Sequence, residues 1–101
     1  MTWIDAEPYL VSYSMLLGPT SNRMSESAFL QASYARSAAE EIIRIARQHP
    51  ETNIFYLLEN YIRRMEKVAC NRYGTFTGFY CSVAHDIGED ILDGLMLKGE
   101  K

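Results

Sequence analysis

Four side chains in the last third of the sequence have the types and spacing of a cation site. They are His85, Asp86, Glu89 and Asp90. On a helix, His85 and Glu89 lie one turn apart on the same face, and imidazole nitrogens and carboxylate oxygens both bind metals. Structural zinc, however, takes four ligands, usually Cys or His, and the only other histidine is His49. We therefore interpret the group as a solvated acidic face, and we predict no metal and no other cofactor.

Other catalytic patterns are incomplete in this sequence. A di-iron bundle needs a glutamate three residues before each histidine, and neither histidine has one. An all-α nucleotide pyrophosphatase would hold magnesium between two acidic helices, and Asp90 with Asp93 supplies only half of such a site. Cys81 falls near the apolar face of its helix, where a free thiol acts as a small hydrophobic group. We predict no catalytic residue and no enzyme activity, with a metal-dependent nucleotide hydrolase as a distant alternative.

Charge separates onto two ridges in the second half of the chain. The basic ridge is Arg63, Arg64 and Lys67, and the acidic ridge is Asp86, Glu89, Asp90 and Asp93. Like charges on one ridge repel each other, so folding alone gives little reason to gather them. A charged partner does give a reason, because complementary potentials steer encounter and set register. We predict that both ridges bind protein, although solubility alone also produces single-sign faces.

A nucleic-acid-binding regulator is the main alternative function. Arg63, Arg64 and Lys67, with Arg72 beside Tyr73, are suited to contact phosphates. The chain as a whole carries a net charge of −3, whereas nucleic-acid-binding domains are more often basic. We therefore favour a protein partner over a nucleic acid.

The N-terminal segment is apolar on two sides. Residues 8–22 contain no charged side chain. In a helix, Tyr9, Tyr13 and their neighbours form one face, while Val11 and Met15 lie on the opposite face. Such a helix is either central in a core or covered by a second molecule, and a terminal helix of a small bundle is seldom central. We predict a protein-binding face of Trp3, Val11 and Met15, and a homodimer formed through it.

These residues require helices to position them, and the sequence predicts four. They span about residues 6–17, 25–49, 52–71 and 77–97. Gly18-Pro19 and Pro50 end the first two, because proline cannot continue a helix. Asp5 is the expected cap of the first helix and Thr77 that of the fourth, while Thr52 or Asn53 caps the third.

The helical faces predict how these elements pack. The second helix has a stripe of small residues, mostly alanine, between Ala28 and Ala46, which lets a neighbour approach closely. Ala84 and Gly88 give the fourth helix a similarly close contact with the third. We predict an all-α fold: one domain over residues 1–101, a small four-helix bundle with a C-terminal helical hairpin.

Composition supports a globular domain of ordinary kind. The chain has 101 residues, of which 48% are hydrophobic and 23% charged. Asp5 and Glu7 stand where a signal peptide is positive, and no apolar run approaches the roughly 20 residues of a membrane span. Two cysteines imply no disulfide framework. We therefore predict a cytoplasmic protein that does not contact membrane.

The stretch over residues 62–95 carries a resemblance. It reads IRRMEKVACNRYGTFTGFYCSVAHDIGEDILDGL, with the helix end "RxMxxxAC", an aromatic loop and the helix "FxxSVAxDxxxDILD". This third of the chain resembles short all-α proteins encoded by phages and conjugative elements of gut Gram-positive bacteria. The resemblance implies a mobile-element accessory protein and brings no catalytic residue with it. We therefore expect a non-enzymatic, protein-binding regulator or inhibitor that acts on a bacterial host or defence complex.

Overall fold

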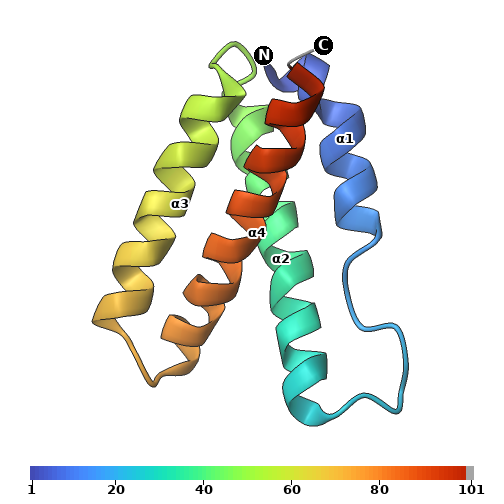
Figure 1. The fold of residues 1–101 in the computed structure, drawn as a ribbon, viewed down its shortest axis with the longest axis vertical. Helices are drawn as coiled ribbons and strands as arrows, with labels where there is room; N and C mark the ends of the chain where they lie inside the picture. Colours follow the sequence, from blue (N-terminus) through green and yellow to red (C-terminus); the bar gives the residue numbers. More distant parts are fainter. Residues whose placement is uncertain (100–101) are drawn as a thin grey trace.

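The computed structural model describes residues 1–99, which form four α-helices and no strand. The helices are α1 (Trp3–Met15), α2 (Glu26–Gln48), α3 (Ile54–Asn71) and α4 (Phe76–Gly99). They run alternately down and up the long axis of the molecule (Figure 1). The prediction of an all-α four-helix bundle is confirmed. Among the described helices, none is long and apolar enough to cross a membrane.

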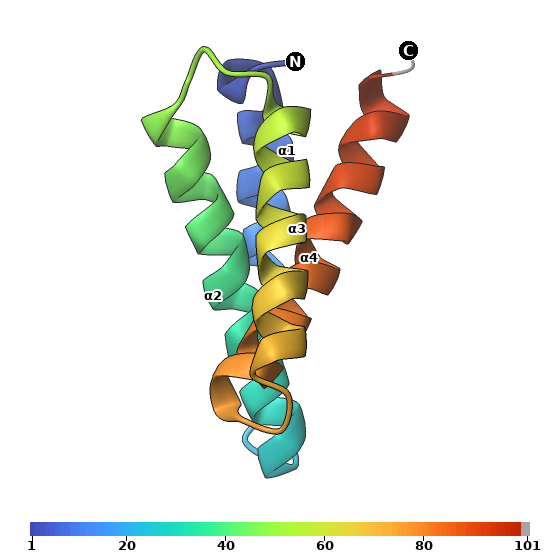
Figure 2. The same cartoon turned by 90° about the vertical axis from the view of Figure 1, so that its left-hand side faces the viewer.

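The four helices are not equivalent in their packing. α2 and α4 each pack against all the other helices, whereas α1 and α3 lie on opposite sides of this central pair (Figure 1). The α3–α4 pair has the most extensive contact, as expected for a helical hairpin. The turned view shows α2 and α4 diverging toward the end that holds both chain termini (Figure 2). The α1–α2 and α3–α4 connections both lie at the opposite end, on different sides of the central pair (Figure 1).

Side-chain caps fix the starts of α2 and α3. Ser25 accepts a hydrogen bond from the Ala28 N–H at the start of α2, and Asn53 accepts one from the Phe55 N–H at the start of α3. The predicted cap of α1 is wrong, because that helix begins at Trp3 and Asp5 lies within its first turn. An acidic group there still favours the helix, since it faces the positive end of the helix dipole.

The core is built from small residues on α2 and larger ones on its neighbours. Ala38, Ala39 and Ala46 are at most 1% exposed, so the facing helices approach α2 closely. The largest fully buried side chains are Tyr61, Leu10, Ile54, Leu58, Ile91 and Leu95. Tyr61 brings a hydroxyl into this core, which donates to Glu41 Oε1 on α2 over 2.6 Å. That bond satisfies a polar group that would otherwise be costly to bury.

The hairpin of α3 and α4 packs as tightly as the small residues of α4 predict. Ala84 is fully buried. A Cβ built on Gly88 would lie 2.7 Å from Ile62 Cγ1, well inside ordinary van der Waals contact. Gly88 therefore sets the separation of the two helices. Ile62 itself is half-buried.

Candidate functional site

The turn between α3 and α4 is closely packed by its own backbone. Gly74 has a φ of +84°, a conformation that glycine adopts without strain. The Thr75 hydroxyl donates to the Arg72 carbonyl over 2.6 Å and accepts from the Gly78 N–H over 3.0 Å. Thr75, rather than the predicted Thr77, is therefore the cap of α4. A Cβ on Gly78 would overlap the Arg72 carbonyl, so the turn has no room for a larger residue there.

A cleft of about 860 Å³ opens beside this turn, between the end of α3 and the start of α4. Its volume lies within the range of about 300–1,000 Å³ that binding pockets occupy. Aromatic side chains from the turn and α4 line one part: Tyr73, Phe76 and Phe79. Glu66 and His85 line the end that lies farther along the two helices. The cleft is thus aromatic at the turn and polar at the other end.

The aromatic side chains of the cleft are unusually exposed. Tyr73 is 90% exposed, Phe76 75% and Phe79 36%. Phe79 is held in place by α2, because its ring meets the ring of Tyr34 edge-on with centroids 5.7 Å apart. All three aromatic groups line one cleft, so these exposed apolar side chains are gathered at one place rather than scattered over the surface. Such patches on small domains mark interaction sites.

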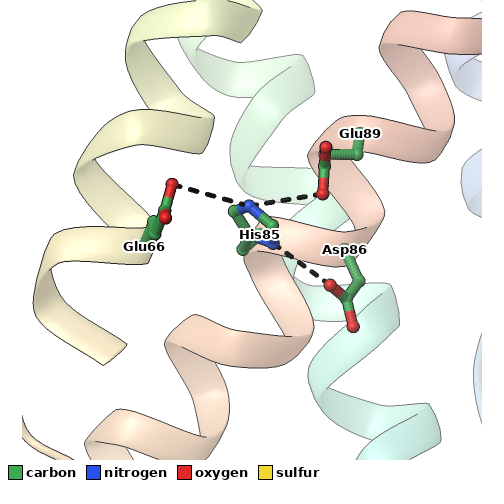
Figure 3. Close-up of polar contacts among 4 residues, drawn as sticks. All are labelled: Glu66, His85, Asp86 and Glu89. Carbon is green, nitrogen blue, oxygen red and sulfur yellow. Dashed lines mark hydrogen bonds and ion pairs between the residues drawn. The ribbon is translucent and has the colours of Figure 1, made fainter. Parts of the chain in front are cut away.

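His85 stands at the polar end of the cleft among three carboxylates (Figure 3). Its Nε2 lies 3.3 Å from Glu89 Oε1 and 3.9 Å from Glu66 Oε2, and its Nδ1 lies 3.1 Å from Asp86 Oδ1. Glu66 comes from α3, whereas the other three residues come from α4. The imidazole is half-buried between the two helices, while the carboxylates are exposed. His85 therefore joins the helices and gathers negative charge around itself.

The geometry of this cluster does not match a tetrahedral metal site. Ligand atoms of His85, Asp86 and Glu89 lie within 4.8 Å of one another. Tetrahedral zinc with bonds of about 2.0–2.1 Å requires its ligand atoms to be about 3.3 Å apart. Asp86 and Glu89 also approach different ring nitrogens, and a single metal ion would use only one of them. The cluster would have to rearrange to hold zinc, but as it stands it presents a strongly negative surface.

That surface continues along α4. We use "acidic strip" for Glu66, Asp86, Glu89, Asp90 and Asp93, which are all exposed. Within residues 1–99, no lysine or arginine makes an ion pair with any of these five carboxylates. The Tyr13 hydroxyl of α1 approaches Asp90 Oδ2 at 3.4 Å. Burial, then the charge of Asp90, raises the pKa of Tyr13 to about 12. The strip therefore reaches from α3 across α4 to the edge of α1.

The predicted basic ridge does not lie beside this strip. The Arg64 guanidinium lies over the Tyr61 ring, 5.6 Å from its centroid, and Tyr61 in turn bonds Glu41 of α2. Arg64 is thus on the α2 side of α3, whereas Glu66 is on the α4 side. Arg63 and Lys67 are exposed on the outer surface between these two sides. The acidic and basic residues that sequence places on neighbouring helices consequently face different directions.

The structure places the three residues of the predicted N-terminal apolar face differently. Trp3 belongs to the core, with the Arg47 guanidinium 5.4 Å from its ring centroid, so it is not on the exposed part of this face. Val11 is half-buried and Met15 is 70% exposed. Both line an open groove of about 540 Å³ between α1 and α2. Arg36, Arg44 and Arg47 of α2 also line this groove, together with Glu40, which pairs with Arg36 over 2.8 Å, so the groove is charged as well as apolar.

The two cysteines have different surroundings. Cys81 is buried, and burial followed by the charge of Glu41 raises the pKa of its thiol. A raised pKa keeps the thiol protonated and unreactive, which agrees with its expected role as a small core residue. Cys70 is free and exposed on the wall of the cleft.

Sequence reasoning missed the aromatic cleft, although a signal was present. Four aromatic residues fall within the eight positions from Tyr73 to Tyr80, around the glycines at 74 and 78. Aromatic residues concentrated at a glycine-containing turn have little core to enter, because a turn lies at the surface. The contribution of Glu66 to the acidic strip has no comparable signal, since it depends on how α3 faces α4.

The comparisons with known proteins add no relative. No protein-family model matches the chain, and no curated protein or solved structure is significantly similar to it.

Proposed function

We propose that this chain is a non-enzymatic protein-binding module that acts as a regulator or inhibitor, and that its partner docks in the cleft between α3 and α4. The observation that supports this most is the exposure of Tyr73, Phe76 and Phe79 around one cleft. Aromatic residues are enriched at the cores of protein interfaces and at the positions that carry most binding energy. Leaving three of them in water costs solubility, and a partner that covers them offsets this cost.

The setting of the partner follows from two further features. The resemblance of residues 62–95 to proteins of phages and conjugative elements favours a bacterial host or defence complex. Cys70 is an exposed free thiol beside the cleft, which suits a reducing compartment. We accordingly propose that the module acts in the cytoplasm as a mobile-element accessory protein.

A capture experiment that compares three versions of the chain tests the proposed function. Tagged wild type, Phe76→Ala and Tyr56→Ala are incubated with lysate of the source cell, and bound proteins are quantified. Tyr56 is the matched control, because it is an exposed aromatic residue of α3 outside the cleft. We expect a partner that Phe76→Ala loses and Tyr56→Ala retains, and that binds again when purified. Equal capture by all three proteins would show that the cleft is not the docking site.

A homodimer is a second proposal, carried by the groove between α1 and α2. Met15 is exposed there beside Val11, which leaves apolar surface for a second copy to cover. Analytical ultracentrifugation over a range of concentrations tests it. We expect a dimer for wild type and a folded monomer for Val11→Glu with Met15→Glu. A wild type that sediments as a monomer at high concentration contradicts this proposal and leaves the cleft unaffected.

A further inference from the structure

We propose that the segment docking at the α3–α4 cleft is a basic amphipathic helix of the partner protein. Its apolar residues enter the aromatic part of the cleft, and its lysines or arginines lie along the acidic strip. This inference rests on the proposed function and specifies the chemistry of the partner.

The charge of the surface supports a basic occupant. The acidic strip holds five carboxylates, and within the described chain none of them is neutralised by a lysine or arginine. Three of these carboxylates converge on His85 at the polar end of the cleft (Figure 3). Like charges held this close repel one another, and cationic side chains of a partner relieve that repulsion. Electrostatic complementarity of this kind sets both the partner and its orientation.

The shape of the surface supports a helix. Asp86, Glu89 and Asp93 are spaced by three and then four residues, and Asp90 lies four residues after Asp86. The four residues therefore follow one face of α4 for about 10 Å, given a rise of 1.5 Å per residue. Basic residues repeated every three or four positions on a second helix match this spacing. The cleft meets the acidic strip at the end of the strip that is nearer to the α3–α4 turn. Glu66 and His85 line the cleft at this point, where Glu66 belongs to the strip and His85 contacts it. An amphipathic helix supplies both kinds of contact from neighbouring faces.

Other occupants fit less well. Residues 1–99 contain no strand, so an extended peptide has no sheet edge to join. Nucleic acid is repelled by the strip, because its phosphates carry the same sign of charge. A second copy of this chain offers Arg63 and Lys67, but the apolar face of that helix is already buried in its own core. The arginines of its α1–α2 groove are also engaged within the chain, because Arg36 pairs with Glu40, Arg44 pairs with Glu41 and Arg47 lies over Trp3. A foreign basic helix is therefore the occupant that meets both the aromatic and the acidic parts.

A peptide selection tests this inference directly, because it requires no identified partner. The probe is a library of helical peptides of about 15 residues, the shortest length at which isolated helices are appreciably stable. Apolar anchors are fixed at helical spacing, and the positions beside them are randomised over basic, acidic and neutral residues. We expect peptides selected on the wild type to be enriched in lysine and arginine. Enrichment in acidic residues, enrichment without charge preference, or no selected peptide would each overturn the inference.

Titration of a selected peptide assigns it to the surface. Glu66→Gln and Glu89→Gln are each expected to weaken binding about two- to fivefold, the range for exposed ion pairs, and Phe76→Ala about 30-fold, as for an interface anchor. Glu51→Gln is the control, because Glu51 is exposed in the connection between α2 and α3 and lies outside both the cleft and the acidic strip. Unchanged melting temperatures verify that the variants fold. Equal effects of Glu51→Gln and Glu66→Gln would refute the location of the basic contacts.

The two proposals fail in different ways. A captured partner that depends on Phe76 but is insensitive to Glu66→Gln and Glu89→Gln keeps the protein-binding function and removes the basic helix. If the chain self-associates and the same two substitutions abolish this, the occupant of the cleft is a second copy of the chain and not a foreign helix. If no captured protein depends on Phe76, the proposed function itself is refuted.

Discussion

Replacing Gly88 by alanine tests the packing that holds the α3–α4 hairpin together. The new Cβ would lie 2.7 Å from Ile62 Cγ1 and 3.6 Å from both Ile62 Cδ1 and Tyr61 Cδ1. Ordinary carbon contacts lie at about 3.5–4.0 Å, so the overlap with Ile62 Cγ1 is about 1 Å. Ile62 yields little, because a β-branched side chain on a helix has one strongly preferred rotamer and Cγ1 is not its flexible end.

Two opposing terms set the magnitude. Overpacking of this kind costs about 1–3 kcal/mol. Alanine is favoured over glycine inside a helix by about 0.8–1.0 kcal/mol. We therefore expect Gly88→Ala to destabilise the protein by about 1 kcal/mol, with a range of about 0–2 kcal/mol. For a domain of this size, 1 kcal/mol lowers the melting temperature by about 4–8 °C.

A double-mutant cycle separates the overlap from the helix propensity. Ile62→Ala removes Cγ1, so adding Gly88→Ala in that background is expected to stabilise the protein by about 0.8–1.0 kcal/mol. The coupling free energy between the two sites is then about 1–3 kcal/mol. Urea denaturation followed by far-UV circular dichroism measures all four proteins. If Gly88→Ala stabilises both backgrounds equally, the close approach of α3 and α4 at this glycine is wrong.

Three other measurements follow from polar groups. Tyr61→Phe removes the donor to Glu41 and should cost about 0.5–1.5 kcal/mol in urea denaturation; no change would mean that this bond adds nothing to stability. The folded-state pKa of Tyr13 is raised from 10.0 to about 12, so its contribution is complete below pH 10 and is lost as pH rises toward 12. Tyr13→Phe should therefore reduce the loss of stability over that interval, and an unchanged pH profile would contradict the environment described for its hydroxyl. All three residues of the basic ridge are exposed, and we expect no salt-sensitive mobility shift with random duplex DNA; a shift that Arg63→Glu with Lys67→Glu abolishes would favour the nucleic-acid alternative instead.

The helices and their approximate ends are predictable from sequence because their determinants are local. Asn53 caps α3 with its own side chain, and the proline at position 50 stops α2 wherever the helix packs. The close contact at Gly88 was also predictable, since a glycine in a buried stripe leaves space that a neighbour fills. The cap at Thr75 was mispredicted by two residues, because the turn folds back on the Arg72 carbonyl and lets α4 begin earlier. That closure is a property of the turn geometry rather than of the helical period.

The candidate site depended more on tertiary structure. Sequence identified the carboxylates of α4 and the arginines of α3, because the angular position of a residue on its own helix follows from its number. It did not determine that Arg64 turns toward α2 while Glu66 turns toward His85. Nor did it determine that Trp3 enters the core while Met15 stays exposed. The rotation of one helix against another is set by how the ridges and grooves of the whole core interlock. The sequence alone therefore determined which faces are charged, and only the packing of all four helices decided which of those charges meet.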